Sequence, residues 1–494
     1  KFCNYVFQCI LGIDFLEQII LRTNFEELKS LQAMSLVWCA LSCVHHFYIR
    51  LRITHGPMDW SRRRQAKKAM RVYEMLMRVM LPELYNSVMY AIVTFYSESR
   101  MWHTEYLCAE LLKRLLYISG ENESTVHAIL DVAEKTSIVN VREARQVIRV
   151  LYQVLDDYPW DTMDESLLYR LLTMFHKSII PNIKDSYDYA PLRKGLEVCI
   201  RHILENLPNF HLLKVIKTMI EWTFDEDLPD ECLLDFGNLL EYAAILHETY
   251  TFKDSLHRDL FPLVLELIAS ENRLHSLLGN RVMQHMMDRH NNRIHFDTPK
   301  IFFDDIHFNI TVGEYRTEDK AFIRKYREMI HTTLLASIQL HGVHRINLES
   351  SYASIAIMVV EIPCGYTAAA IVCLAMAIQE CTLSDDMIDF ENSHRLHATV
   401  MAIMSLVCWV HKAAVFYDYL KTVLERRAQF APHLNPPIRA TYQYAQHHIL
   451  WNKPELFFED WEARYGLWKC FRTRRSRVGS ITNLKQIVSQ HEIS

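Results

Sequence analysis

Residues 398–410 form an apolar run without a polar face, and this run restricts the folds open to the chain. Ser393 supplies a helix start signal ahead of it, and a helix that is apolar all round has to be buried by neighbours on several sides. The next segment, 414–429, places Phe416 and Leu420 on one face and charged side chains on the other. A buried helix followed by an amphipathic one is typical of the helix–turn–helix unit of an α-solenoid.

Helical periodicity covers most of the 494 residues, with only 11 glycines and 14 prolines to interrupt it. Besides these two segments, the pattern predicts a helix capped by Asn24, one that Pro82 ends, and others at about 101–118, 123–135, 142–156, 165–179, 192–206, 210–224, 231–250, 257–270, 274–290, 319–341, 349–361, 366–381 and 436–450. Two helices in about 40–50 residues is the size of a HEAT or armadillo unit, although no consensus recurs at a fixed period. The sequence therefore predicts an all-α, armadillo/HEAT-like α-solenoid.

The predicted solenoid covers residues 1–468, and residues 469–494 are predicted to be a basic, flexible tail. Residues 290–319 have few helix signals and are expected to form an ordered loop. A last aromatic stretch is expected to cap the end of the stack; it contains Phe457, Phe458, Trp461, Tyr465 and Trp468.

Composition excludes several classes of protein. The net charge of −5 argues against a nucleic-acid binder, and cysteines without any C-x-x-C pair indicate a reducing, intracellular setting. The longest apolar runs, Ala33–Val44, Ala368–Ile378 and Ala398–Val410, are shorter than the roughly 18–20 residues that span a bilayer. No signal-peptide pattern is present, and the start at Lys1 instead of Met suggests a fragment or processed form.

Motifs for catalysis and for cofactors are missing from the sequence. The glycines form no G-x-S-x-G elbow, G-x-G-x-x-G turn or P-loop, so we expect no enzyme activity and no cofactor. His285, His290 and His295 flank Asp288, but a spacing of five puts them on different helix faces. We therefore predict no metal site there, only a helix end whose polar side chains bond the next loop.

A basic run between residues 62 and 71 is the first candidate site. It lies at a helix start, where the helix dipole favours acids, so the charges need another explanation. Anionic lipid head groups attract such clusters by roughly 1 kcal/mol per basic residue. Alternatives are a solvated face paired with Glu74 and Glu83, or a partner-protein site. The predicted lipid-binding residues are Arg62, Arg63, Arg64, Lys67, Lys68 and Arg71.

The second candidate site is the start of the tail. Cys470 stands beside basic residues, the setting of an acylation site, and Ser476 and Ser480 suit basophilic kinases. Phosphate there would subtract positive charge and act as an electrostatic switch. The alternative is a disordered tail with chance basic residues. The basic residues of this second patch are Lys469, Arg472, Arg474, Arg475 and Arg477.

Two motifs carry a resemblance to a known family. The string M-D-R-H-x-N-R at 287–293 and the R-x-x-x-A-P ending at 427–432 lie within residues 255–437, which resemble the rolling-blackout family. The resemblance implies a helical, armadillo/HEAT-like peripheral protein of the plasma membrane. It also implies recruitment of the type III alpha phosphatidylinositol 4-kinase through a tetratricopeptide-repeat adaptor, and so support of phosphatidylinositol 4-phosphate synthesis.

The chain departs from the family pattern at both ends. Members carry a palmitoylated, cysteine-rich N-terminus that Cys3 and Cys9 do not reproduce, and they are longer at the C-terminus, where adaptor contacts lie. The first hypothesis is thus a non-enzymatic scaffold on the cytoplasmic face of the plasma membrane, with anionic phospholipids and a lipid-kinase complex as partners. Alternatives are a soluble helical-repeat adaptor in the cytosol, or a lipid hydrolase, which the missing G-x-S-x-G disfavours.

Overall fold

Helices are the only regular secondary structure in the part of the chain that the structure describes. The computed structural model describes residues 2–22, 30–53, 60–81, 83–156, 165–179, 186–224, 229–303, 306–384, 390–442 and 453–472. The chain forms two compact units, Lys1–Pro208 and Asn209–Ser494. The predicted all-α class is confirmed.

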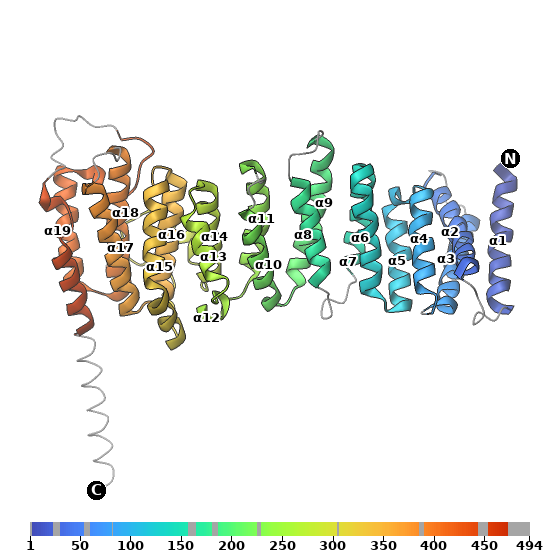
Figure 1. Cartoon of the computed structure of the whole chain (residues 1–494), viewed down its shortest axis with the longest axis horizontal. Helices are drawn as coiled ribbons and strands as arrows, with labels where there is room; N and C mark the ends of the chain where they lie inside the picture. Colours follow the sequence, from blue (N-terminus) through green and yellow to red (C-terminus); the bar gives the residue numbers. More distant parts are fainter. Residues whose placement is uncertain are drawn as a thin grey trace, which may run out of the picture. The chain divides into compact units, whose positions relative to one another are not determined.

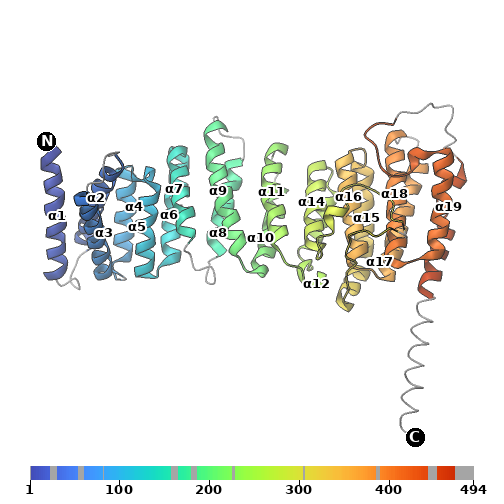
Figure 2. The same cartoon turned by 180° about the vertical axis from the view of Figure 1, so that it is seen from behind.

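The first unit is built from helices that pack on their near neighbours in sequence. Helix α2 contacts α3 and α4, α7 contacts α6 and α9, and α1 lies against α2 and α3. The views from two sides show the same side-by-side order within this unit (Figures 1 and 2). Its helices are α1 (Phe2–Arg22), α2 (Ser30–Ile53), α3 (Trp60–Met80), α4 (Tyr85–Glu98), α5 (Glu105–Ser119), α6 (Asn122–Val139), α7 (Val141–Leu155), α8 (Glu165–Ile179) and α9 (Ser186–Asn206).

The second unit continues the pattern, with α14 against α16, α15 against α17 and α18 against α16, α17 and α19. Contacts to the next helix and to the one after it are what a stack of helix pairs produces, so the solenoid prediction holds within each unit. Its helices are α10 (Asn209–Thr223), α11 (Asp230–Leu246), α12 (Phe252–Ser255), α13 (Phe261–Ala269), α14 (Arg273–Met287), α15 (Thr317–His341), α16 (Arg345–Glu361), α17 (Gly365–Ser384), α18 (Phe390–His411) and α19 (Ala414–Phe430).

Helix α18 is the central helix that its composition predicts, because residues 398–408 are all buried. It begins at Phe390, three residues before the expected start, so Ser393 is buried inside the helix and does not cap it. The break to α19 falls after His411, as expected, and Lys412 takes a left-handed backbone conformation there (φ 50°).

One helix within the described ranges is long and apolar enough to cross a bilayer by length and composition alone. This candidate span is Gly365–Leu383 in α17, and it is longer at both ends than the apolar run Ala368–Ile378 identified in the sequence. Half of its most apolar stretch is buried. The same helix packs between α15 and α18, which is the position of a core helix in a stack.

Other differences concern helix ends. Residues 436–442 are not helical, so the helix predicted at 436–450 is wrong over this part; 443–450 lie outside the described residues. Two consecutive prolines, Pro436 and Pro437, explain the difference, because proline disfavours the helical conformation of the residue before it. Asn24 and Pro82 also lie outside the described residues.

The loop after α14 is ordered as predicted, with a short 3₁₀ turn at Arg293–His295 and no strand in its described residues. Two of its side chains, Phe296 and Phe302, are fully buried. Its path is fixed by main-chain bonds: the Phe302 N–H donates to Ser405 Oγ (3.1 Å), and the Gly313 N–H donates to the Val360 carbonyl (2.8 Å).

The C-terminal aromatic stretch caps the stack only in part. Phe457 and Phe458 are buried, and Phe457 packs in a cluster with Leu434 and Leu456. Trp461 and Trp468, on the helical residues 460–472, are exposed instead, so the cap prediction is wrong for them. The helical residues also include 469–472, the first four residues of the predicted tail.

Candidate functional site

The basic run lies on α3, and three of its members share one side of that helix. Arg64, Lys67 and Arg71 are exposed and follow the i, i+3, i+7 spacing of a single helical stripe. Arg78 continues the stripe one further heptad on and is also exposed, although it lies outside the predicted run. The side chains of Arg62 and Arg63 lie outside the described residues. We call Arg64, Lys67, Arg71 and Arg78 the α3 stripe.

Lys68 is engaged inside the protein, unlike the stripe. Its Nζ donates to Asp14 Oδ1 (2.5 Å) and lies 3.0 Å from Glu17 Oε2, both on α1. These bonds, first of all the one to Asp14, raise the pKa of Lys68. Glu74, one of the acids weighed as a partner for the basic run, pairs with Arg114 of α5.

The face of α1 near these acids carries apolar side chains in water. Phe15 is 66% exposed, and Leu11, one turn before it, is 50% exposed. Helix α1 contacts α3, so exposed apolar side chains and the α3 stripe belong to neighbouring helices of one unit. Phe15 is not among the predicted site residues, and its i, i+4 spacing with Leu11 is the sequence signal for this apolar pair.

The second basic patch is described only at its start. Lys469 and Arg472 are exposed on the helical residues 460–472. Cys470 is half-buried, and its Sγ lies 3.6 Å from the His411 carbonyl oxygen. The remaining members of the patch and both predicted phosphorylation sites lie outside the described residues: Arg474, Arg475, Arg477, Ser476 and Ser480.

The M-D-R-H-x-N-R motif forms a buried polar lock at the end of α14. Arg289 donates from Nε to Glu361 Oε2 and from Nη1 to Asp319 Oδ2, both at 3.0 Å, and its Nη2 reaches the Glu361 carbonyl at 3.0 Å. Both carboxylates are fully buried. Asp319 also accepts the Phe252 N–H at 3.0 Å. The Arg289 guanidinium thus connects the end of α14 to α16 and to the start of α15, and the Asp319 carboxylate connects α15 to α12.

The rest of the motif fixes the loop that follows. Asp288 accepts the backbone N–H groups of Asn292 (2.8 Å) and Arg293 (2.7 Å). Asn292 exchanges two hydrogen bonds with the backbone of Thr311, at 2.8 and 2.9 Å. A Cβ at Gly313 would lie 3.1 Å from the Glu361 carbonyl oxygen, which explains glycine at this close approach.

Two of the three histidines around Asp288, His285 and His290, have separate hydrogen-bond partners. His290 Nδ1 donates to Glu361 Oε1 at 2.9 Å, and His285 Nε2 accepts from Arg293 Nη1 at 2.8 Å. Burial first, and then Arg293 and Arg281, lower the pKa of His285 to about 4, so it is neutral at pH 7. The described residues contain no group of histidines, cysteines and acids arranged to hold a metal ion.

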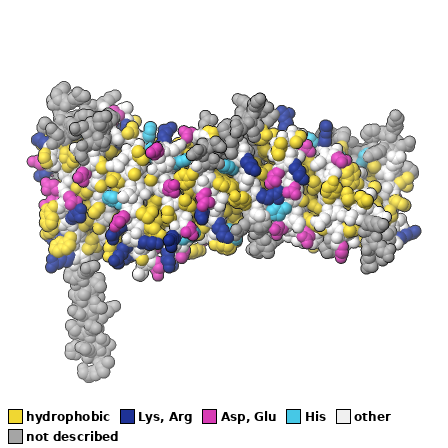
Figure 3. Space-filling model, in the orientation of Figure 1, with side chains coloured by type: hydrophobic (Ala, Val, Ile, Leu, Met, Phe, Trp, Pro, Cys, Tyr) yellow, Lys and Arg dark blue, Asp and Glu magenta, His cyan; other side chains and the backbone are white. Residues whose placement is uncertain are grey.

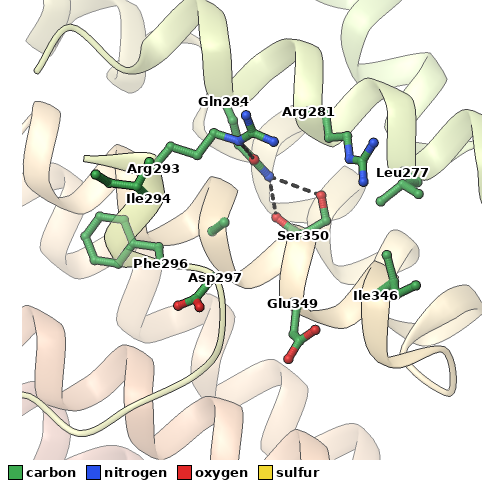
Figure 4. A pocket seen from close by; sticks show the side chains of 11 residues that line it. Leu277, Arg281, Gln284, Arg293, Ile294, Phe296, Asp297, Ile346, Glu349 and Ser350 are labelled. Carbon is green, nitrogen blue, oxygen red and sulfur yellow. Dashed lines mark hydrogen bonds between the residues drawn. The ribbon is translucent and has the colours of Figure 1, made fainter. Parts of the chain in front are cut away.

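A pocket of about 390 Å³ opens beside this motif, between α14, α16 and the loop (Figure 4). Arg293 donates to Gln284 Oε1 (3.0 Å), and Gln284 Nε2 donates to the Ser350 carbonyl (2.7 Å). The guanidinium groups of Arg281 and Arg293 lie beside Gln284 and Ser350, and the carboxylates of Asp297 and Glu349 lie across the pocket. Two positively charged side chains face two negatively charged ones, so the lining of this pocket favours neither an anionic nor a cationic ligand.

The R-x-x-x-A-P motif forms a second lock around a fully buried arginine. Arg427 Nε donates to the Leu456 carbonyl (2.6 Å), and Nη1 donates to those of Leu434 (3.0 Å) and His397 (3.2 Å). Burial lowers the pKa of Arg427 to about 9, so it is still charged at pH 7. We call Arg427 and these three carbonyls the Arg427 lock.

Serine–histidine pairs exist, but their surroundings do not match a hydrolase. His247 Nε2 lies 3.0 Å from Ser255 Oγ, and both side chains are buried, away from any substrate. At the exposed pair, Ser166 Oγ lies 3.1 Å from His127 Nε2, while Arg170 donates to His127 Nδ1 (2.8 Å). A triad requires a carboxylate that accepts from Nδ1, and here a cation donates to it.

Comparison with known proteins identifies the family. The family model described as EFR3, armadillo repeat, matches residues 57–455. Protein EFR3 homolog A from Mus musculus and from Homo sapiens are each 23% identical to the chain over 178 residues. This segment is 36% of the chain and 22% of each relative's length, and no solved structure matches the chain.

The match agrees with the two locks, since both motifs lie within the matched residues and hold the second unit together. EFR3 and rolling-blackout proteins are one family, so the resemblance found in the sequence is confirmed. The chain belongs to the EFR3 family of armadillo-repeat proteins.

Proposed function

We propose that this protein is a non-enzymatic peripheral scaffold on the cytoplasmic face of the plasma membrane. It would recruit a phosphatidylinositol 4-kinase complex through a tetratricopeptide-repeat adaptor and so support phosphatidylinositol 4-phosphate synthesis. The observation that carries the membrane part is the α3 stripe; the kinase part rests on family membership.

The charges of the stripe are available to an external anion. Within the described residues, none of Arg64, Lys67 and Arg71 takes part in an ion pair, whereas Lys68 and Arg114 on the same unit do. Four basic side chains at roughly 1 kcal/mol each give about 4 kcal/mol of attraction to an anionic surface. Phe15 and Leu11 on α1 add apolar area for the lipid interface.

Proximity, not chemistry, is the role that this arrangement supports. The polar clusters described above tie helices together, and their serine–histidine pairs lack the carboxylate that orients a catalytic base. A scaffold that binds the membrane through the α3 stripe would keep a bound partner near the membrane surface.

Vesicle sedimentation tests the membrane part. The variant Arg64→Glu, Lys67→Glu, Arg71→Glu should bind phosphatidylserine-containing vesicles at least about ten-fold more weakly than the wild type, and wild-type binding should fall with salt. The control Lys135→Glu, Arg142→Glu, Lys177→Glu carries the same charge change on other helices of the first unit.

Equal binding by the stripe variant and the control would remove the α3 stripe from the mechanism. If the wild type bound no vesicles and yet formed a salt-sensitive complex with the adaptor, the soluble-adaptor alternative would replace this proposal.

A further inference from the structure

The helical residues 460–472 turn aromatic side chains toward solvent. Trp461 is 70% exposed, Trp468 53% and Tyr465 37%. Their i, i+4, i+7 spacing puts them on one side of the helix, and each ring stacks on the next at 6.0 Å between centroids. We call these three residues the aromatic stripe.

The opposite side of this helix is the one that packs on the protein. Ala463 and Leu467 are buried, and Gly466 lies so close to α19 that a Cβ there would be 2.8 Å from Phe416 Cβ. The contact fixes the rotation of the helix about its own axis. At about 100° per residue, the aromatic stripe and Arg472 lie directly across the helix axis from this packed side.

Positive charges accompany the stripe at its C-terminal end. Arg472 Cζ lies 4.9 Å from the centre of the Trp468 ring, and Lys469 Nζ lies 5.8 Å from that of Tyr465. The nearby acids, Asp460 and Glu462, stand at the other end of the helix, and Asp460 is neutralised by Arg464 at 2.7 Å. Figure 3 shows hydrophobic side chains gathered over this end of the second unit, with lysine and arginine side chains beside them.

Helices α17 and α15 add another exposed aromatic ring with cations beside it. Gly365, at the start of α17, lies against Phe471, with 3.5 Å from its ideal Cβ position to the ring. The next residue, Tyr366, is 43% exposed, and Lys320 and Arg324 of α15 lie 5.4 and 5.9 Å from its ring centre.

A groove separates the two helices. It has a volume of about 470 Å³ and lies between the start of α17 and residues 464–472. Apolar side chains including Val372, Leu467 and Phe471 form its walls, and Arg464 and Arg472 also line it.

Aromatic rings interleaved with cations match the interface of an anionic bilayer. Tryptophan and tyrosine settle at the level of the head groups, with the ring among acyl chains and the polar atom in water. Arginine and lysine reach the lipid phosphates from the same depth.

We propose that residues 460–472 form a second membrane contact, in which the aromatic stripe inserts into the head-group layer of an anionic bilayer and Arg472, Lys469, Lys320 and Arg324 bind lipid phosphates. The groove beside Phe471 gives room to part of an acyl chain. This inference rests on the proposed peripheral membrane function and adds an apolar anchor to it, separate from the α3 stripe.

Flotation with vesicles of phosphatidylcholine, with and without phosphatidylserine, tests the contact. The variant Trp461→Ala, Tyr465→Ala, Trp468→Ala should bind phosphatidylserine vesicles at least about ten-fold more weakly. The control Tyr90→Ala, Tyr106→Ala, Tyr117→Ala removes three exposed aromatic rings of the first unit, which are 61%, 68% and 86% exposed, and should bind like the wild type. All three aromatic-stripe residues are at least 37% exposed, so the variant should keep the thermal stability of the wild type.

Tryptophan quenching gives a second readout. Brominated lipids should quench wild-type fluorescence, and the conservative variant Trp461→Phe, Trp468→Phe should lose most of that quenching although seven of nine tryptophans remain. Equal vesicle binding by the aromatic-stripe variant and its control, or quenching that survives in the phenylalanine variant, would overturn this contact alone. A wild type that binds no vesicles would overturn the proposed function and this contact together. A concentration-dependent dimer that the aromatic-stripe variant abolishes, with vesicle binding unchanged, would assign the surface to a second copy.

Discussion

Replacing Arg427 with methionine tests whether the R-x-x-x-A-P motif is a structural lock. The side chain is fully buried and its guanidinium donates to three carbonyls, on Leu456, Leu434 and His397. These carbonyls come from three separate segments: α18, the turn after α19, and the turn that precedes residues 460–472. Methionine keeps an unbranched apolar side chain, shorter than that of arginine, and removes every donor.

The expected loss of stability is about 2 kcal/mol. The carbonyls of Leu456 and Leu434 lose the Arg427 donor while they stay buried, at about 1 kcal/mol or more each, whereas the His397 carbonyl lies inside α18 and keeps its helix hydrogen bond. Removing a buried charge recovers part of its desolvation cost, and the shorter methionine loses part of the packing, so these two effects offset one another. The control Arg426→Met changes the exposed neighbour on the same helix and should cost less than about 0.5 kcal/mol.

The same substitution should change how stability depends on pH. Burial lowers the pKa of His394 to about 3 and that of His433 to about 4, and Arg427 is the second cause for His433. Below about pH 6.5 these two histidines therefore bind protons in the unfolded chain but stay neutral in the folded protein. The free energy of unfolding consequently falls as the pH falls toward 4. Between about pH 6.5 and 5, two histidines give at most about 4 kcal/mol, and we expect about half of it because nearby solvent screens the charges.

Without the arginine charge, the pKa of His433 should rise toward its ordinary value, so the variant should lose less stability on acidification than the wild type. Urea denaturation followed by circular dichroism at pH 7.5 and 5.0 measures both effects. A loss below about 1 kcal/mol at pH 7.5, or an equal acid dependence of wild type and variant, would refute the lock as described.

Three further outcomes follow from the second unit. Glu361→Gln should cost about 3 kcal/mol in urea denaturation, since Arg289 loses a buried carboxylate partner, while the control Glu425→Gln at an exposed pair should cost under about 0.5 kcal/mol. Gly279→Ala should lower the melting temperature clearly, because its Cβ would lie 2.8 Å from the Ile268 backbone nitrogen. Gly237→Ala should lower it less, since its Cβ meets only the side chain of Leu278, which can move.

The sequence predicts the fold well because helical periodicity and burial have the same physical cause. Residues 398–410 have no polar face, so only a position surrounded by other helices satisfies them, and α18 occupies such a position. Helix ends were predicted less accurately, because a start signal such as Ser393 has the same appearance when its hydroxyl lies inside a helix. The consecutive prolines at 436 and 437 were the local signal against a helix there.

Candidate sites were harder to predict, because a charged residue in a sequence does not show whether the fold already uses its charge. Lys68 and Arg71 look alike in the basic run, yet Lys68 donates to Asp14 of α1, which lies 54 positions away in the sequence. Arg289 and Arg427 belong to the two most recognisable motifs, and both donate hydrogen bonds to groups inside the protein. In contrast, Trp461 and Trp468 suggested a cap and are exposed instead.

Charged side chains that bond inside the protein stabilise the fold, whereas charged side chains exposed to solvent can bind a membrane. Arg289 and Arg427 donate to groups inside the second unit, so the two family motifs supply contacts that hold this unit together. The exposed side chains of the described residues include the α3 stripe in the first unit and the aromatic stripe with its cations in the second. Both combine positive charge with exposed apolar side chains, which is the chemistry of an anionic membrane surface. Loss of either stripe should weaken vesicle binding. If both stripes bind the same membrane and each holds the other near the surface, loss of both should weaken binding by less than the product of the two single effects, because each single loss already removes the coupling.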